Sequence, residues 1–196
     1  MLFAPLPAPA KESFSSDWRY DDYPTANPNV ILHFSPVTSW AEYQLDTPLA
    51  RQVLTATAAL VAAKQPATEV VSHDGENFIP TGNSGVEKPP LVWGIFVANV
   101  CDNQAFTWQV AAQAAAAYKK WADEQTAEGV YAPPITLRNP NVPPRQPGYV
   151  VGFMGLVQRP RPGLVQGVTG DTPTGPAHHA IEALKGDCAV GSEATQ

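Results

Sequence analysis

The sequence predicts an α+β domain of two layers, in which two helices pack on a mixed, mostly antiparallel sheet. Residues 91–98 are an almost unbroken apolar run, rich in β-branched and aromatic side chains, which is typical of a strand buried on both faces. Two other segments repeat apolar residues at helical spacing. The predicted order is strand, helix, hairpin, strand, helix, irregular segment, strand, which favours the α+β class over a shorter α/β arrangement.

The length of 196 residues suits one domain with extensions, large enough to bury roughly 70% of the surface of the unfolded chain. The chain holds 21 prolines and 14 glycines, which predicts long irregular segments. We expect an extended, proline-rich arm over residues 1–28, a core domain over 29–170 and a flexible C-terminal tail over 171–196. Within the core domain, residues 129–170 are predicted to form Arg/Pro-rich loops.

Three elements are predicted before the central strand. Residues 29–34 favour a short buried strand. Thr47 is a favourable N-cap for a helix that Pro66 must end. Residues 68–79 predict a β-hairpin, because the Asp-Gly pair at 74–75 suits a tight turn between two short strands.

The second helix is predicted to follow the central strand and to end near Trp121. Asp102 or Asn103 is the expected N-cap. Its apolar stripe consists of Phe106, Val110, Ala114, Ala117 and Trp121. Four consecutive alanines, 114–117, allow another backbone to approach closely.

Residues 129–170 differ in character from the rest of the chain. This window contains no acidic residue, eight prolines and four arginines. Residues 148–157 within it predict a strand, and its glycines indicate bulges or close packing under another element.

The arm carries an unusual cluster at residues 17–23, which combines three large aromatic residues with three acids. Disordered tails rarely carry so many aromatic rings. Two interpretations remain open. The arm folds back on its own domain, or its rings anchor it on a neighbouring subunit.

The acidic, aromatic arm and the arginine window are complementary, because arginine pairs well with both carboxylates and aromatic faces. Contact between subunits therefore explains both features at once. The predicted partner contacts are Trp18, Tyr20, Asp21, Asp22, Tyr23, Arg138, Arg145, Arg159 and Arg161. An alternative is binding of single-stranded nucleic acid, with the arginines on phosphates and with Tyr149 and Phe153 as stacking surfaces. The net charge of −6 argues against a polyanionic partner.

Cys101 is the residue that most suggests an enzyme. The two cysteines, Cys101 and Cys188, lie far apart, have no metal-type spacing and are predicted to be free thiols. A thiol at the turn into the second helix would be favoured as the reactive thiolate. The candidate bases are His33, His73, His178 and His179, and nothing in their order selects one. A cysteine-dependent hydrolase or transferase is the third alternative.

The predicted function is that of a non-enzymatic structural subunit of a homo-oligomeric or larger assembly, in the style of a virion, phage neck or phage tail component. Copies of the chain or other subunits are the expected partners, and no cofactor or metal is predicted. No stretch has the roughly 18 uninterrupted apolar residues of a transmembrane helix, and the N-terminus lacks the features of a signal peptide. The expected location is the cytoplasm or a virion-like particle.

Overall fold

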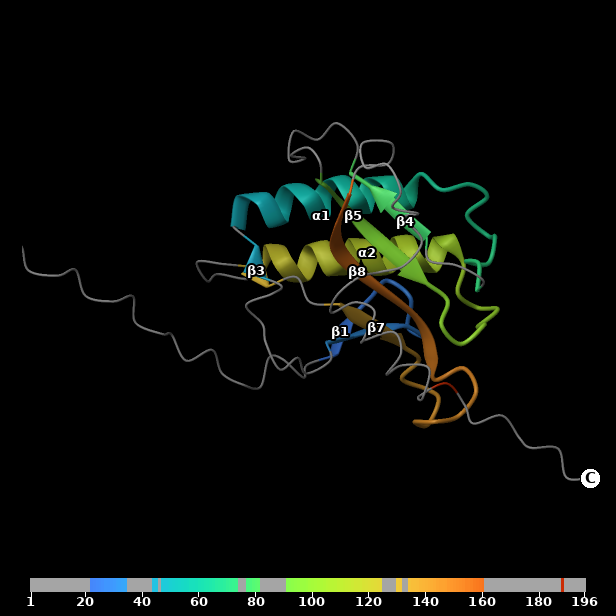
Figure 1. Ribbon diagram of the computed structural model, residues 1–196. Coiled ribbons are helices and arrows are strands. Elements are labelled where there is room, and N and C mark those ends of the chain that lie inside the picture. Colours follow the sequence, from blue (N-terminus) through green and yellow to red (C-terminus); the bar gives the residue numbers. More distant parts are fainter. Residues whose placement is uncertain are drawn as a thin grey trace, which may run out of the picture.

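A six-stranded antiparallel sheet, covered on one face by two helices, forms the fold of the protein (Figure 1). The computed structural model describes residues 22–34, 44–45, 47–73, 77–81, 91–124, 130–131, 134–160 and 188. The predicted α+β class with two helices packed on a sheet is confirmed. Every strand pair of this sheet is antiparallel, so the sheet is not mixed.

The strands of the main sheet are β1 (Asp22–Pro24), β2 (Ile31–Phe34), β4 (Asn77–Pro80), β5 (Leu91–Ala98), β7 (Ile135–Arg138) and β8 (Val150–Pro160). Their spatial order is β1-β2-β7-β8-β5-β4, so the β7–β8 pair lies in the middle. The helices are α1 (Thr47–Ala62) and α2 (Trp108–Asp123). A second sheet pairs β3 (Gln44–Leu45) with β6 (Val130–Tyr131).

The predicted strands at 29–34, 91–98 and 148–157 correspond to β2, β5 and β8. Both faces of β5 are buried, as its apolar run predicts. Ile95 and Val97 lie in the core beneath the helices. Phe96 and Ala98 lie in a separate buried cluster on the opposite face, because successive side chains of a strand point to opposite sides.

The helix-facing core contains a group of large aromatic side chains that join the two layers. Phe34 of β2 stacks on Trp121 of α2 with ring centroids 4.3 Å apart, and Tyr118 lies 6.3 Å from Phe34. All three side chains are buried. Offset and tilted aromatic pairs of this kind add to the stabilisation from burial alone.

Close packing at a glycine of β8 is also confirmed. A Cβ atom at Gly152 would lie 2.3 Å from the ring of Phe106, which is itself fully buried. The neighbouring strand β7 shifts its register against β8 between Leu137 and Arg138, opposite this position. Both predicted features, a bulge and close packing, therefore occur at this glycine.

The first helix begins at Thr47 as predicted, but the second begins later than expected. The N-cap of α2 is Thr107, whose side-chain oxygen accepts a hydrogen bond from the backbone N–H of Val110. The prediction of Asp102 or Asn103 as the cap is wrong. Asp102 has a φ of +48°, and the side chain of Asn103 serves the backbone of its own loop.

The predicted hairpin over residues 68–79 is wrong as well. Residues 77–80 form β4, which pairs with β5 and not with the preceding segment. That segment instead receives the free N–H groups at the start of α2: Trp108 donates to the carbonyl of Glu69, and Gln109 to that of Ala67. The segment before the Asp-Gly pair therefore acts as a cap for α2.

Besides β3 and β6 of the second sheet, two strands of the main sheet lie where the sequence predicted none. β1 lies inside the predicted arm and pairs with β2, so residues 22–24 belong to the sheet. β7 lies inside the window predicted to be irregular, between β2 and β8. Short strands beside prolines give weak sequence signals, so both strands can be identified only from the neighbouring strands with which they pair.

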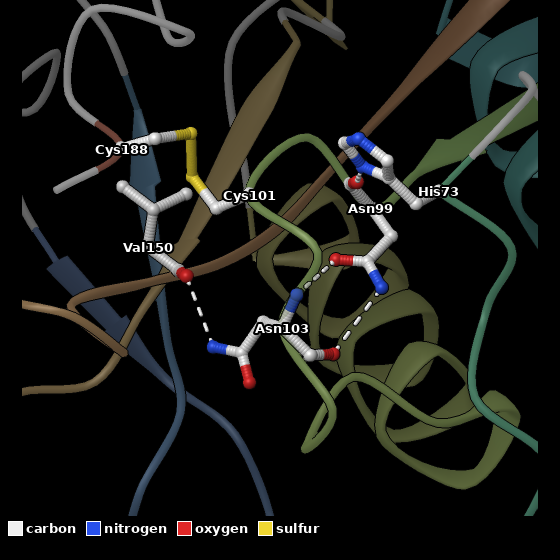
Figure 2. Close-up of a disulfide and its surroundings, with 6 residues drawn as sticks. All are labelled: His73, Asn99, Cys101, Asn103, Val150 and Cys188. Carbon is white, nitrogen blue, oxygen red and sulfur yellow. Dashed lines mark hydrogen bonds between the residues drawn. A yellow bond between two sulfur atoms is a disulfide. The ribbon is translucent and has the colours of Figure 1, made fainter. Parts of the chain in front are cut away.

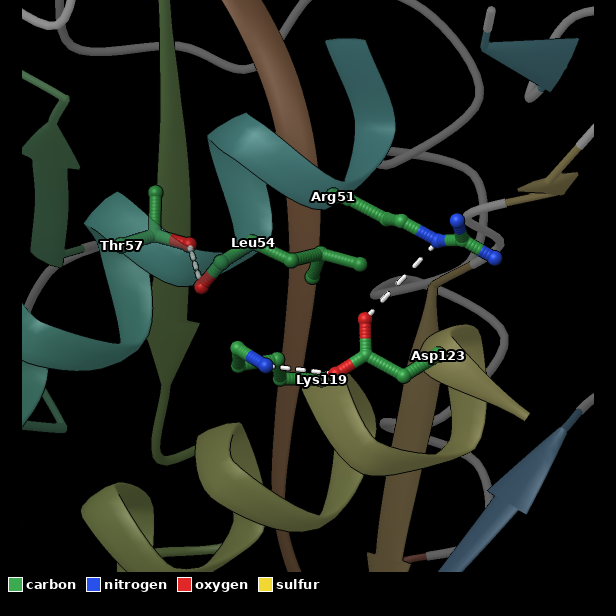
Figure 3. A network of polar contacts seen from close by, with 5 residues as sticks. All are labelled: Arg51, Leu54, Thr57, Lys119 and Asp123. Carbon is green, nitrogen blue, oxygen red and sulfur yellow. Dashed lines mark hydrogen bonds and ion pairs between the residues drawn. The ribbon is translucent and has the colours of Figure 1, made fainter. Parts of the chain in front are cut away.

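The two helices lie side by side and are connected by charges at their exposed edge (Figure 3). Asp123 of α2 accepts a hydrogen bond from Lys119 and lies 3.9 Å from Nε of Arg51 on α1. The hydroxyl of the buried Thr57 donates to the carbonyls of Val53 and Leu54 within α1. The exposed pairs contribute little individually, so apolar packing carries this contact.

Candidate functional site

Three connections and one isolated cysteine gather at one end of the sheet, which we call the loop end. It consists of residues 25–30, 99–107 and 139–149, together with Cys188. The strand register explains why they meet. The last residue of β7, Arg138, pairs with the first residues of both β2 and β8, so the turns beyond them lie together (Figure 1). The same register brings the C-terminal end of β5 to this side.

The connection between β7 and β8, residues 139–149, is exposed yet held in place. Most of its side chains are exposed, and four of its eleven residues are proline. Asn139 donates its N–H to the carbonyl of Tyr149 across the stem, and Tyr149 donates to Gln146. The side chain of Asn141 donates to the side chain of Asn29 in the neighbouring turn, at 3.0 Å. An exposed loop with this many restraints is preorganised for contact.

Asparagine side chains fix the connection between β5 and α2 (Figure 2). The buried Asn99 donates to the carbonyls of Val71 and Asn103 and accepts from the N–H of Asn103. Asn103 in turn donates to the carbonyl of Val150 at the start of β8. His73 Nδ1 lies 2.8 Å from the carbonyl oxygen of Asn99. Of these two asparagines, the sequence pointed only to Asn103, and only as a helix cap.

Cys101 forms a disulfide with Cys188, so the prediction of two free thiols is wrong (Figure 2). Their Cα atoms are 5.3 Å apart although the residues are separated by 87 positions in the sequence. This pairing cannot be deduced from the spacing of the two cysteines in the sequence. It depends on how the fold brings residue 188 to the loop end. The disulfide counts against Cys101 as the nucleophile of the predicted cysteine-dependent hydrolase or transferase, since a disulfide sulfur is not the thiolate that such an enzyme requires.

Two hollows lie on either side of residues 139–149. The first, about 300 Å³, is bordered by the disulfide, Asp102, Gln104 and Gln146. The second, about 400 Å³, lies between Asp22 and Ile31 on one side and Arg138, Pro143 and Tyr149 on the other. A third, about 610 Å³, lies away from this loop, along the alanines of α2 beside residues 24–26.

Among the residues described, two of the predicted contact residues line a hollow, Asp22 and Arg138. The guanidinium of Arg138 lies over the ring of Tyr149, 5.3 Å from the ring centroid. Arg145 lies on the same loop, is exposed and has a φ of +66°. Arg159 pairs with Val92 and lies nine residues along β8 from Val150, the partner of Arg138, which is roughly 30 Å, so the structure does not bring it to the loop end. Arg161 lies outside the described residues.

Two of the predicted contact residues in the arm are described, and both have partners within their own chain. Asp22 accepts a hydrogen bond from His33 at 2.8 Å, which makes His33 a satisfied histidine of an edge strand pair. The hydroxyl of Tyr23 donates to Glu124 at 2.8 Å. Burial first, and then the hydrogen bond to Glu124 and its negative charge, raise the pKa of Tyr23 to about 12. Folding back on the domain is thus the correct interpretation for this part of the arm.

The remaining predicted residues divide into two groups. Trp18, Tyr20, Asp21, His178 and His179 lie outside the described residues. Phe153 is described and is 1% exposed, so it does not offer the stacking surface expected for nucleic acid. Tyr149 keeps a partly exposed ring, and it is paired with Arg138.

Comparison with protein-family models, with curated proteins and with solved structures yields no match. Neither α1 nor α2, the helices in the described part of the chain, has the length and hydropathy of a membrane span. The geometry of the loop end is therefore the basis for a functional proposal.

Proposed function

We propose that this protein is a non-enzymatic structural subunit of a homo-oligomeric or larger assembly, and that the loop end is its docking surface. The supporting observation is the 139–149 connection, which is exposed, proline-rich and pinned by hydrogen bonds at its stem and tip. A preorganised loop loses little conformational entropy on binding, which is the property that a repeated assembly contact needs. A virion, phage neck or phage tail is the setting that we propose.

The charges on this loop support a protein partner. Arg138 and Arg145 are its cations, and residues 134–160 contain no acid. Arginine is enriched at protein interfaces because its planar fork binds carboxylates and stacks on aromatic rings. Asp22 and Tyr23 already have partners, so the arm residues proposed for contact are Trp18, Tyr20 and Asp21.

The disulfide supports an oxidising setting for the finished assembly. Disulfides persist outside the reducing cytoplasm and are rare within it. We therefore place the working protein in a particle exposed to oxidising conditions and not in the cytoplasm itself. Thiol labelling of protein from its native setting under denaturing, non-reducing conditions tests this, since labelling of Cys101 and Cys188 would contradict it.

Size-exclusion chromatography with light scattering, over a series of concentrations, tests the assembly proposal. We expect the full chain to form a defined oligomer, and Arg138→Gln with Arg145→Gln to weaken it. Deletion of the arm for this purpose must stop at residue 20, because residues 22–24 form β1. A chain that is monomeric at all concentrations, with and without residues 1–20, overturns the proposal.

Binding of single-stranded nucleic acid is the second candidate. One observation favours it: Arg138 lies over Tyr149 at the edge of a hollow, a pair suited to a phosphate and a base. The burial of Phe153 and the acidic net charge weigh against it. Titration with oligothymidine at increasing salt concentrations tests this candidate. If the protein contacts phosphates, its affinity for oligothymidine must fall steeply as the salt concentration rises.

A further inference from the structure

The hollow beside Arg138 combines a cation with apolar walls. Its volume of about 400 Å³ falls in the range of ligand sites. Pro140, Pro143, Pro144, Ile31 and Val142 line it together with the ring of Tyr149. These walls are largely exposed in the free protein, so a ligand that covers them excludes water from the guanidinium and strengthens the ion pair that it forms there.

Arg138 has an unmet hydrogen-bonding requirement. Its Nε atom is shielded from solvent and has no hydrogen-bond partner in the part of the chain that the structure describes. The guanidinium lies over the Tyr149 ring, whose face attracts the cation but accepts no conventional hydrogen bond from Nε. Buried donors on charged groups are rarely left unpaired in native proteins, so a ligand toward which the Arg138 side chain turns this N–H would complete the site.

The surrounding charges select the kind of anion. Asp22 also borders the hollow, where its carboxylate is already bonded to Nδ1 of His33 at 2.8 Å. One guanidinium beside one carboxylate suits a singly charged ligand and repels a chain of phosphates. A carboxylate can take two parallel hydrogen bonds from the arginine fork, including the one from Nε.

We infer that this hollow binds an Asp or Glu side chain on an acidic, aromatic-containing peptide segment of a partner subunit. The carboxylate receives the Nε–H of Arg138, and an adjacent aromatic ring packs against the proline and tyrosine walls. Residues 16–21 of the chain carry this combination of acids and aromatic rings, so they supply the probe. This inference names the partner chemistry for the proposed docking surface and rests on that proposal.

Nuclear magnetic resonance of the full chain with ¹⁵N-labelled arginine tests the inference at the atom concerned. The probes are a synthetic peptide with the sequence of residues 16–21 and a matched peptide with Asp17→Asn and Asp21→Asn. The Nε–Hε signal of Arg138 should shift saturably with the acidic peptide, and the amide peptide should bind at least about tenfold more weakly.

Matched variants separate the site from general charge. Arg138→Gln should abolish saturable binding of the acidic peptide, and Arg138→Lys, which keeps the charge but lacks the fork, should not restore it. Lys120→Gln, which removes an exposed cation of α2 outside the hollow, should leave the affinity within about twofold, a change smaller than the contribution of one hydrogen bond. Circular dichroism and thermal unfolding show whether each variant remains folded.

Three outcomes overturn the inference: no shift of the Arg138 signal, equal binding of the acidic and amide peptides, or a stronger response to inorganic phosphate or oligothymidine than to the peptide. The assay does not require self-association, so it separates the two proposals. If the protein is oligomeric but does not bind the peptide, only the inference about the hollow is wrong. If the protein is monomeric and binds the peptide, the inference about the hollow stands and the proposed homo-oligomer is wrong.

Discussion

The helix-covered face of the sheet and its opposite face are buried by different means. Under the helices, residues from both helices and from five of the sheet's strands form one large cluster with an aromatic centre at Phe34 and Trp121. The opposite face has a small cluster of Phe96, Ala98, Val100 and Phe153. The disulfide lies against this second cluster.

The second face also contains an unsatisfied polar group. Thr136 lies opposite Phe153 in the β7–β8 register, so its side chain faces the small cluster, and its buried hydroxyl has no hydrogen-bond partner among the residues described. Among the described residues, packing therefore holds the first face, whereas the second combines a small cluster with a covalent connection. The loop end lies beside that connection, so we expect its geometry to depend on the disulfide.

Loss of the disulfide is the largest expected effect. Cys101→Ser, Cys188→Ser and the double variant should each lower the free energy of unfolding by about 4 to 5 kcal/mol, because the bond closes a long loop in the unfolded chain. Denaturant unfolding measures this, and reductant should bring the wild type to the level of the variants. A loss below about 1 kcal/mol, well under the usual range, would contradict the dependence of the second face on this bond.

Phenylalanine truncation on the two faces tests their independence. Phe34→Ala should cost about 3 to 5 kcal/mol with or without the disulfide, since its stacking partner Trp121 lies on α2. Phe153→Ala should cost less once the disulfide is removed, because the two share one cluster. Double-mutant cycles with Cys188→Ser measure both couplings. Equal coupling energies of Phe34 and Phe153 with the disulfide would show that the two faces do not differ in their dependence on it.

Alanine substitutions at two glycines of β8 compare the packing of the two faces through smaller changes in stability. Gly152→Ala should destabilise by about 1 to 3 kcal/mol, because its Cβ would enter the space of the buried Phe106 ring. At Gly155 the nearest atom is 3.0 Å away on the ring of Phe96, and Gly155→Ala should cost less than about 1 kcal/mol. Thermal unfolding of the two variants measures the difference. A reversed order would mean that the second face is the more rigid.

The smallest effect concerns Tyr23 at the β1 edge. Its pKa of about 12 lies above the ordinary value of about 10, so the folded state favours the neutral phenol. The resulting stabilisation is complete below pH 10 and is lost as the pH rises from about 10 to about 12. The stability difference between wild type and Tyr23→Phe should shrink across this window. The tyrosinate absorbance of the wild type minus that of the variant should titrate near pH 12, and a midpoint at 10 would contradict the contact with Glu124.

The elements predicted correctly from the sequence are those whose signal is local. The apolar run at 91–98 and the Thr47-Pro48 start depend only on neighbouring residues. Apart from the cap of α2, which was predicted a few residues too early, the errors involve distant partners. Residues 77–80 pair with β5 across a long connection, and residues 67–71 cap a helix that begins about forty positions later. No periodicity in the sequence encodes such pairings.

The candidate site was predicted in part. Charge and proline content singled out Arg138 and Arg145 before the structure placed one in a hollow and the other on the adjacent loop. The disulfide and the Asn99–Asn103 network were missed, because each depends on which segments the register brings to the loop end. An asparagine that directly follows a buried strand is the signal that would have indicated the network.

Site-specific photo-cross-linking tests the central claim, that the loop end is the docking surface, most directly. A photoreactive residue would replace the exposed Gln146 in the 139–149 connection or, as the control, the exposed Gln65 beyond the end of α1. We predict efficient subunit-to-subunit cross-links from position 146 and few from position 65. Equal cross-linking from both positions, or none from position 146 in an oligomeric preparation, would contradict the claim.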